Sequence, residues 1–373
     1  MAEVRLCMVL GGHWAAQMGG AQFQAKCLLE LMTARAEFET FYVTHVAPRE
    51  RFQPGYEIVR FGPGQTSGAS GVLSQLPSLY SVLKRLRPDV VYQRCLMPYT
   101  GACALYCAGT GARLIFHVAS DWDVRKPKFS GWGPRVVLHR LSRWISEYGL
   151  RRASAIIVQT HDQARTLKTE YGLDATLVVP NVQPLPPPRE PVARSGPRRV
   201  IWVGNFKPVK NPELFLDLAA AFAKDGSVRF VMIGRAGDAT YAPLHDRIRQ
   251  MANVDYLGEL PVESVDAEIA ASDILVNTSS TEGFPNTFIQ GWLRGVPAVS
   301  CSVDPDGCLS RGGAGIMAGS PARLVTVISE LLADEEKLRA LSLAAREYGR
   351  RNHTLERAQG LIDLLAHRKA GTK

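Results

Sequence analysis

The sequence predicts an α/β protein built from two doubly wound parallel-sheet domains of the Rossmann type. Short apolar runs typical of buried strands alternate with longer stretches of helical periodicity along nearly the whole chain. A chain of 373 residues exceeds what one hydrophobic core usually organises. Residues 181–197 are rich in proline, so they can hardly form helix or sheet, and we expect a stiff linker there.

The N-terminal domain is expected to span residues 1–180. Its predicted strands are Leu6–Leu10, Phe41–Val46, Asp89–Tyr92, Leu114–Val118 and Ala155–Val158. Helix-like stretches such as Gln22–Met32 and Leu73–Leu86 separate these strands. Strands that alternate with helices in this way indicate βαβ units and a parallel sheet.

The second domain is expected to span residues 198–345. Its predicted strands are Val200–Val203, Phe230–Ile233, Ile274–Val276 and Ala298–Ser300. The last stretch, Asp334–Ala370, has a helical pattern, and residues 346–373 are expected to form a separate C-terminal helix.

Composition excludes several classes of protein. Hydrophobic residues make up 46% and charged residues 21%, which is ordinary for a globular protein, and no apolar run is long enough to span a bilayer. The charged N-terminus reads as a strand and not as a signal peptide. Seven cysteines without a Cys-x-x-Cys pair favour free thiols in the cytoplasm over disulfides or a zinc site.

The most informative segment is Thr281–Gln290, which follows the apolar run 273–277. Pro285 suits the first position of a helix, whose exposed N–H groups and positive dipole end favour an anion. A carboxylate beside an anion site would repel a phosphate, so Glu282 is better placed to accept hydrogen bonds from hydroxyl groups. Phosphate together with a polyol indicates a sugar nucleotide.

This segment resembles the Glu-x7-Glu signature of the retaining GT-B glycosyltransferases of family 4 (glycosyl transferases group 1). The resemblance implies two Rossmann-like domains that face a central cleft, with the last helix packing back on the first domain. It also implies that Glu282 holds the donor sugar and that the helix start holds the diphosphate, through Gly283, Phe284, Pro285, Asn286 and Thr287. The second acidic position is Gln290 here, which would reach the ribose without a charge-assisted bond.

The loop after Val200–Val203 carries further donor-site candidates. Lys210 matches the family lysine that meets the diphosphate, where negative charge builds as the leaving group departs. The family arginine position is Asn205 in this chain, and Lys207 is either its replacement or a lysine in a solvated turn. Arg235 follows the strand Phe230–Ile233 and either lines the donor site or belongs to an ordinary loop.

The N-terminal domain should supply the acceptor side. Gly19 and Gly20 precede the first helix, so their amides could approach the donor phosphates, or they could simply form a helix-start turn. His117 ends a strand where the family often places an active-site histidine, although a structural role is the alternative. Asp121 is a weaker candidate for a general base.

Two Asp-x-Asp pairs superficially match the metal motif of a different glycosyltransferase fold. They are Asp304 with Asp306, and Asp121 with Asp123. Such spacing is common by chance and the two-domain pattern is wrong for that fold, so no metal and no cofactor are expected.

The net charge is +9, and residues 121–152 concentrate it. This segment has three acids (Asp121, Asp123, Glu147) and eight Lys/Arg: Arg125, Lys126, Lys128, Arg135, Arg140, Arg143, Arg151 and Arg152. Trp132, Trp144 and several aliphatic residues interleave with these charges. A helix of this kind either lies on an anionic membrane surface or buries an apolar stripe and exposes its cations to water.

The sequence therefore predicts a metal-independent glycosyltransferase that moves a sugar, with retention, from a UDP- or GDP-linked donor to an acceptor hydroxyl. The acceptor could be a glycan, a lipid-linked sugar or a small molecule. We expect a cytoplasmic protein, peripheral to the inner face of a membrane if the basic helix binds lipid. No nucleic-acid recognition motif accompanies the charge. A sugar-nucleotide epimerase of the same fold and a degenerate sugar-nucleotide-binding protein are the alternatives.

Overall fold

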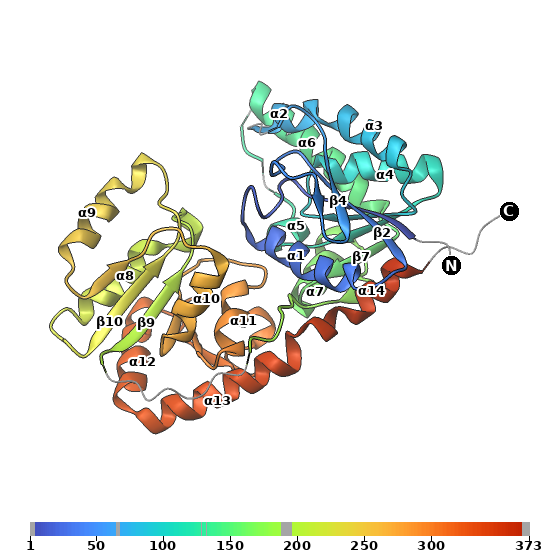
Figure 1. Cartoon of the computed structure of the whole chain (residues 1–373). Helices are drawn as coiled ribbons and strands as arrows, with labels where there is room; N and C mark the ends of the chain where they lie inside the picture. Colours follow the sequence, from blue (N-terminus) through green and yellow to red (C-terminus); the bar gives the residue numbers. More distant parts are fainter. Residues whose placement is uncertain (1–3, 65–67, 128, 132, 188–195, 368–373) are drawn as a thin grey trace. The chain divides into compact units, whose positions relative to one another are not determined.

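The computed structural model describes residues 4–64, 68–127, 129–131, 133–187 and 196–367 and divides into two units (Figure 1). Unit 1 comprises the residues up to Val182 together with those from Leu355 on, and unit 2 is Gln183–Thr354. Lys128, Trp132 and residues 188–195 of the expected linker lie outside the described residues.

Unit 1 contains a sheet with the strand order β3-β4-β2-β1-β5-β6-β7-β8. Its strands are β1 (Val4–Val9), β2 (Phe38–Thr44), β3 (Phe52–Gln53), β4 (Tyr56–Arg60), β5 (Val90–Arg94), β6 (Arg113–His117), β7 (Ala155–Val158) and β8 (Leu177–Val178). Neighbours from β4 to β8 pair in parallel, whereas β3 pairs antiparallel with β4. The predicted parallel sheet is confirmed, and the short strands β3, β4 and β8 are additions to the prediction.

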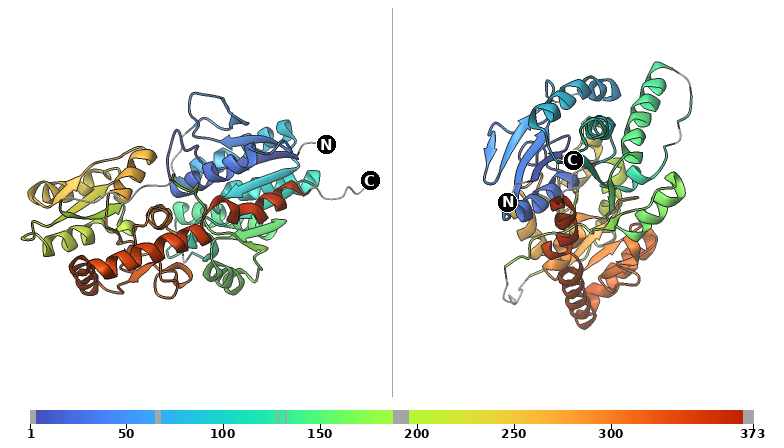
Figure 2. Two further views of the ribbon diagram at one scale, coloured as in Figure 1. Left: turned by 60° about the horizontal axis from the view of Figure 1, so that its bottom comes forward. Right: turned by 90° about the vertical axis from the view of Figure 1, so that its right-hand side faces the viewer.

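Helices cover both faces of this sheet (Figures 1 and 2). They are α1 (Gly20–Thr33), α2 (Gly68–Ser74), α3 (Leu76–Leu86), α4 (Pro98–Thr110), α5 (Asp121–Val124), α6 (Pro134–Arg151), α7 (His161–Tyr171), the short η4 (Leu355–Ala358) and α14 (Gln359–Ala366). Side chains of α1, η4 and α14 share a core with one face, and side chains of α3, α4 and α7 pack on the other.

The helix predicted over Leu73–Leu86 is wrong as a single helix, because α2 ends before Gln75 and α3 begins after it. Gln75 is buried, where its side chain donates to the Gly64 carbonyl and accepts from the Tyr99 hydroxyl. Pro77 in the first turn of α3 has no N–H to continue the preceding helix, and it favours a new helix start.

Glycine allows α4 and α6 to pack closely. A Cβ atom at Gly149 would lie 2.4 Å from the Thr100 carbonyl, and one at Gly101 would lie 2.5 Å from the Ile145 carbonyl. Both obstacles are backbone atoms, which cannot move aside as the end of a flexible side chain can. The two helices therefore depend on glycine at both positions.

Gly149→Ala is expected to lower the free energy of unfolding by about 1–3 kcal/mol, because the added methyl group forces α4 and α6 apart. The midpoint of urea unfolding, read by circular dichroism, measures the loss. Gly109→Ala is the matched control, since this α4 glycine has open space around its Cβ position. The control should be neutral or more stable by up to about 1 kcal/mol. An unchanged midpoint for Gly149→Ala would contradict the packing described.

Unit 2 contains a parallel sheet with the strand order β11-β10-β9-β12-β13-β14. Its strands are β9 (Arg198–Val203), β10 (Val228–Ile233), β11 (Val254–Tyr256), β12 (Ile274–Asn277), β13 (Ala298–Ser300) and β14 (Gly315–Met317). This doubly wound sheet is also confirmed, and β14 is an addition to the prediction.

The helices of unit 2 form two layers (Figure 1). They are α8 (Pro212–Ala221), α9 (Ala242–Gln250), α10 (Val262–Ala270), α11 (Asn286–Leu293), α12 (Pro321–Ala333) and α13 (Glu335–Asn352), with the short η1 (Pro208–Lys210), η2 (Ala239–Tyr241) and η3 (Pro305–Gly307). The layer of α8, α9 and α12 packs on one face of the sheet, and the layer of α10 and α11 packs on the other.

The C-terminal stretch is not one helix from Asp334 to Ala370. The helix α13 ends at Asn352 in unit 2, and the chain enters unit 1 at Leu355 and not at residue 346. The helix is followed by His353, whose buried ring lies 4.7 Å from the Phe284 ring and whose carbonyl accepts the Gln183 N–H. The linker likewise begins at Gln183, since Val182 is still buried in unit 1.

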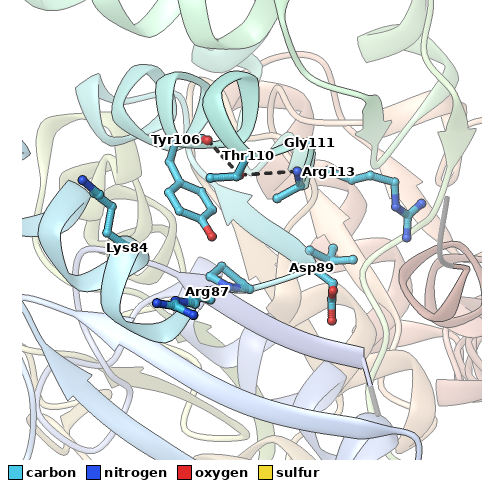
Figure 3. Close-up of a pocket in the computed structure, with 10 residues that line it drawn as sticks. Lys84, Arg87, Asp89, Tyr106, Thr110, Gly111 and Arg113 are labelled. Atoms are coloured by element: carbon cyan, nitrogen blue, oxygen red, sulfur yellow. Dashed lines mark hydrogen bonds between the residues drawn. The ribbon is translucent and has the colours of Figure 1, made fainter. Parts of the chain in front are cut away.

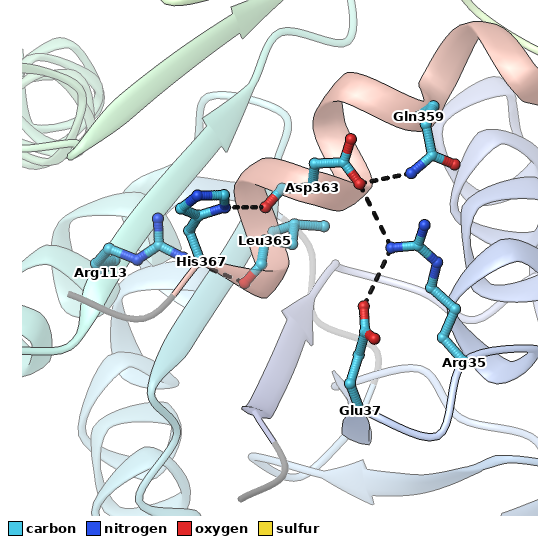
Figure 4. Close-up of polar contacts among 7 residues, drawn as sticks. All are labelled: Arg35, Glu37, Arg113, Gln359, Asp363, Leu365 and His367. Carbon is cyan, nitrogen blue, oxygen red and sulfur yellow. Dashed lines mark hydrogen bonds and ion pairs between the residues drawn. The ribbon is translucent and has the colours of Figure 1, made fainter. Parts of the chain in front are cut away.

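Polar contacts attach α14 to the rest of unit 1 (Figure 4). An Arg113 Nη2 donates to the carbonyls of Leu364 (2.9 Å) and Leu365 (3.2 Å). These carbonyls belong to the last turn of α14, where a cation also compensates the negative end of the helix dipole. Arg35 contacts Asp363 at 3.5 Å on the same helix. Among the described residues, no helix is long and apolar enough to cross a bilayer.

Candidate functional site

The candidate site lies in unit 2, where the loops after β9 and β12 meet. In the sheet, β10 and β11 lie on one side of β9, while β12, β13 and β14 lie on the other. The strand order therefore reverses between β9 and β12. Open α/β sheets bind ligands at this switch point, outside the carboxyl ends of the strands.

The loop after β9 is fixed by hydrogen bonds to both neighbouring loops. The Trp202 indole donates to the Thr278 hydroxyl (2.9 Å), which donates to the Lys210 carbonyl (2.7 Å). On the other side, the Asn205 side-chain oxygen accepts the backbone N–H of Arg235 at 3.0 Å. Lys210 at the end of η1 is thus held beside the loop that follows β12.

Gly234 shows how tightly the loops after β9 and β10 approach each other. Its φ is +150°, and a Cβ atom there would lie 1.9 Å from the Gly204 carbonyl oxygen. Any residue other than glycine would push these loops apart. The Gly204 N–H also donates to the Ile233 carbonyl at 2.9 Å.

Glu282 makes one ion pair and two hydrogen bonds with described residues at the switch point. Its Oε2 lies 2.8 Å from Lys210 Nζ, and its Oε1 accepts from Asn277 Nδ2 (2.9 Å) and from the Ser279 hydroxyl (2.6 Å). The carboxylate is 15% exposed and the lysine side chain 29% exposed. The structure therefore brings together the two predicted residues Lys210 and Glu282.

Both charged groups retain capacity for a ligand. A carboxylate has about four acceptor positions, of which the three contacts described leave room for a hydroxyl. An ammonium carries three N–H groups, and among the described residues Glu282 is the contact found for the Lys210 ammonium. The pair can thus accept from a sugar hydroxyl and donate to a phosphate oxygen at neighbouring points.

The helix α11 begins next to this pair. It starts at Asn286, so Pro285 occupies the N-cap and not the first helical position, because its ψ of 117° is extended. No side chain caps this helix start. The Gln183 side chain donates to the Asn286 carbonyl at 2.9 Å, and Gly283 and Phe284 are buried beneath the loop. Backbone N–H groups at such a terminus suit an anion.

Gln290 is engaged with a neighbour that the sequence did not reveal. Its Nε2 donates to Asp266 Oδ1 at 2.8 Å, and Arg294 contacts the other oxygen of Asp266 at 2.6 Å. A glutamate at position 290 would place two carboxylates face to face, which is unfavourable. Asp266 therefore provides a physical reason for an amide where the family pattern has an acid.

Other predicted residues lie in the loops after β9 and β10 and in the first turn of α11. Lys207 is exposed and Arg235 is exposed, each at the carboxyl end of a strand. Thr287 is half-buried in the first turn of α11. The sequence reasoning missed Asn277, Ser279 and Asp266. A polar residue ending the apolar run before Glu282 was the available signal for Asn277.

In unit 1 the predicted glycines lie at the start of α1. Gly19 is the N-cap of this helix, with φ −159°, and the helix begins at Gly20. Its first turn has no acidic residue and no side-chain cap. The preceding loop is anchored by His13, which is buried against Trp14 and Tyr42.

His117 is buried inside unit 1. Its Nδ1 lies 2.8 Å from the Tyr92 hydroxyl, and the side chain is 2% exposed. Burial, with the Arg94 charge as the second cause, lowers the pKa of His117 well below its usual range. The ring is therefore neutral at pH 7. Asp121 accepts from the Gln163 amide at 3.1 Å, and burial raises the pKa of its carboxyl.

The contribution of His13 to stability is expected to fall as the pH is lowered from 6.5 towards 4. Burial lowers the pKa of His13 from 6.5 to about 4, so the unfolded chain binds a proton in this window that the folded chain rejects. The contribution of neutral His13 to the free energy of unfolding is fully present above pH 6.5. It is lost as the pH falls through 4. Thermal unfolding at a series of pH values measures the slope, and His13→Gln should show a shallower one. Identical slopes would contradict this account.

The two Asp-x-Asp pairs support loops. Asp123 accepts the N–H groups of Leu96 and Ala119, and Asp304 accepts those of Leu309 and Ser310. Within the described ranges, no group of three or more His, Cys, Asp or Glu side chains is placed to hold a metal ion.

A pocket of about 550 Å³ lies elsewhere, in unit 1 (Figure 3). Lys84, Arg87, Asp89, Tyr106 and Arg113 are among its lining residues. It sits at the amino-terminal ends of β5 and β6, the edge opposite to the one where such sheets bind ligands. The Arg113 guanidinium is directed to the α14 carbonyls (Figure 4). We therefore place the candidate site at the β9–β12 switch point.

Two family profiles match the chain. Residues 197–334 match "Glycosyl transferases group 1", and residues 19–182 match "Glycosyl transferase 4-like domain". A D-inositol 3-phosphate glycosyltransferase of Geodermatophilus obscurus is 29% identical over 220 residues, covering 52% of this chain and 49% of that protein. A glycosyltransferase 1 domain-containing protein 1 of Xenopus tropicalis is 24% identical over 162 residues, covering 42% and 46%. The matches thus span about half the length of these curated relatives.

Solved structures show the same fold. HepE of Anabaena, in complex with UDP and glucose, has a TM-score of 0.73 at 16% identity, over 98% of this chain and all of that one (100%). Sucrose-phosphate synthase from Thermosynechococcus elongatus has a TM-score of 0.78 at 16% identity, over 97% and 98%. WaaG, a glycosyltransferase involved in lipopolysaccharide biosynthesis, has a TM-score of 0.75 at 14% identity, over 98% and 100%. With two doubly wound sheets, a lysine–glutamate pair at the switch point and both halves matched, the chain belongs to the group 1 (family 4-like) glycosyltransferases of GT-B fold.

Proposed function

We propose that the protein transfers a sugar from a nucleotide-sugar donor to an acceptor hydroxyl, with retention of anomeric configuration and without a metal ion. The observation that carries the proposal is the contact of 2.8 Å between Lys210 and Glu282 beside the start of α11. A cation, a carboxylate and a helix N-terminus within one loop cluster match a diphosphate joined to a polyol.

The parts of the donor have distinct partners in this proposal. Glu282 accepts from the sugar hydroxyls, held in place by Asn277 and Ser279. The diphosphate lies between the Lys210 ammonium and the amides of residues 283–287. Gln290 serves the ribose end through its carbonyl oxygen, because its N–H donates to Asp266.

The transfer exchanges one bond at the anomeric carbon for another. The bond to the diphosphate oxygen breaks and a bond to the acceptor oxygen forms. The proton of the acceptor hydroxyl passes to the departing diphosphate oxygen as the nucleoside diphosphate leaves. Negative charge then builds on the leaving diphosphate, where the Lys210 ammonium and the α11 N–H groups stabilise it. No covalent enzyme intermediate is proposed.

A second cation is expected near the diphosphate. Asn205 occupies the family arginine position, and its side chain accepts the Arg235 N–H, which brings Arg235 to the same loop. Lys207 and Arg235 are both exposed there. We assign the missing charge to one of these two residues.

The identities of the donor nucleotide and of the acceptor are proposed from other observations than the Lys210–Glu282 contact. Structures of HepE hold UDP and UDP-glucose, which supports a UDP-linked donor for this chain, with a GDP-linked donor as the alternative. Unit 1 is assigned the acceptor side. The α1 amides after Gly19 are candidates for contact with the donor phosphates, and the neutral ring of His117 is a candidate to bond the donor sugar or to steer the acceptor hydroxyl. A glycan, a lipid-linked sugar and a small molecule are the acceptor classes, and a lipid-linked sugar would be met at a membrane surface.

A panel of UDP- and GDP-sugars tested by thermal shift examines the proposal. A true donor should raise the melting temperature, because it binds the native state. Incubation with and without acceptors, followed by analysis of the sugar nucleotide, then separates the alternatives. Epimerised donor without any acceptor would favour an epimerase, and tight binding without turnover would favour a binding protein. No shift with any of these compounds would refute the donor site.

A further inference from the structure

The helix α6 exposes an apolar stripe that unit 1 does not use for its core. Val137, Leu141 and Trp144 are 58%, 45% and 65% exposed. Their spacing of four and then three residues places them on one face of the helix. A different side of the helix packs on α4 through Ile145 and Gly149. Single exposed apolar residues are ordinary, but a row of three on one helix forms a continuous surface.

A neighbouring segment carries a further exposed aromatic residue and two exposed cations. Trp122 on α5 is 65% exposed, and the exposed Arg125 and Lys126 follow it. Arg143 of α6 donates to the Arg125 carbonyl at 2.8 Å, so the segment is attached to α6. We call Val137, Leu141 and Trp144 the α6 apolar surface. Figure 2 shows α6 along the outside of unit 1.

The exposed charged side chains among the described residues of 121–152 are of one sign. Exposed cations on these segments are Arg125, Lys126, Arg135, Arg140, Arg151 and Arg152. The acids of residues 121–152 are engaged elsewhere. Asp123 is buried and accepts backbone N–H groups, Asp121 accepts from Gln163, and Glu147 pairs with Arg143 at 2.9 Å.

Arg143 differs from the other cations of the helix. It is 16% exposed and contacts Glu147, the Tyr171 hydroxyl and the Arg125 carbonyl. It therefore stabilises the fold of this region and does not belong to the surface. Arg135 and Arg140 are exposed and lie in the same half of α6 as Val137 and Leu141.

We propose that the α6 apolar surface and its flanking cations dock the protein on an anionic lipid bilayer. Large aromatic and aliphatic side chains enter the boundary between headgroups and acyl chains, while arginines contact the lipid phosphates. Charge complementarity selects this partner, because a second copy of the chain would bring two positive surfaces together. Nucleic acid would match the arginines but would leave Val137 and Leu141 without a partner. The docking is independent of the proposed sugar transfer.

Co-sedimentation of the full chain with vesicles tests the proposal. Vesicles of phosphatidylglycerol and phosphatidylcholine should bind the protein at least tenfold more tightly than vesicles of phosphatidylcholine alone, and added salt should weaken the binding. The variant Leu141→Ser with Trp144→Ser, and the variant Arg135→Glu with Arg140→Glu, should each weaken binding at least tenfold. The matched control is Leu343→Ser, an exposed leucine of α13 in unit 2 (62%), which should bind as the unmodified protein does.

Circular dichroism and the urea midpoint establish that each variant is folded before binding is compared. Equal binding to both kinds of vesicle would overturn the proposal, as would unchanged binding by both double variants. A dimer in size-exclusion chromatography that Trp144→Ser abolishes, without vesicle binding, would also overturn it and assign the surface to a second copy.

Discussion

Replacing Lys210 by alanine is expected to lower the rate of sugar transfer by about 10²- to 10³-fold, the cost of removing one preorganised stabiliser of developing negative charge. The ammonium lies 2.8 Å from Glu282, and its backbone carbonyl is fixed by Thr278. Its removal takes a positive charge from the leaving diphosphate. It also leaves the Glu282 carboxylate uncompensated beside that diphosphate, so donor affinity should fall as well.

Steady-state kinetics with the donor identified by thermal shift measures the effect of Lys210→Ala. Lys224→Ala is the matched control, since this lysine is exposed and lies in the turn before the amino-terminal end of β10. The control should keep normal kcat and KM. Near-normal turnover of Lys210→Ala would refute the assigned role.

Glu282→Gln is expected to lower kcat/KM about 10- to 150-fold. The change keeps the size and one acceptor of the side chain, but it exchanges charge-assisted hydrogen bonds for neutral ones, a loss of roughly 1.5–3 kcal/mol. Asn277 and Ser279 both donate to Oε1, so the amide of the variant must turn its oxygen towards them and its N–H groups towards Lys210. The Lys210 ammonium then loses its partner and its fixed position.

The pair should behave as a unit in a double-mutant cycle. The combined variant Lys210→Ala with Glu282→Gln should lose less activity than the two single losses multiplied, because each single change already disrupts the other group. Glu330→Gln, which changes an exposed acid on α12, serves as the control and should be neutral. Independent, multiplicative effects would contradict a functional contact between Lys210 and Glu282.

The sequence predicted best those elements that a local run of residues identifies without any tertiary contact. Apolar runs located β7 and β13 to the residue, because a buried parallel strand is a short, nearly continuous hydrophobic stretch. Lys210 and Glu282 were proposed because the loops after two such strands resemble the motifs of the family. Glycosyltransferase membership followed from those loops.

Contacts between distant elements could not be predicted in this way. Nothing near Gln290 in the sequence points to Asp266, which reaches it from α10 through the tertiary fold. The residue after α13, His353, packs against Phe284 from a distant part of the sequence, and Arg143 donates to a carbonyl in another segment. Helical periodicity carries no information about such tertiary contacts. The sequence therefore did not predict the end of α13 at Asn352 or the internal contacts of Arg143.

The central claim is that the donor diphosphate binds unit 2 between Lys210 and the start of α11. A crystal structure of the protein with a bound UDP- or GDP-sugar tests it most directly. We predict phosphate oxygens within hydrogen-bond distance of Lys210 Nζ and of amides in residues 283–287, with sugar hydroxyls on Glu282. Density for the nucleotide sugar at another place, with the Lys210–Glu282 pair unaltered and without ligand contacts, would contradict the claim.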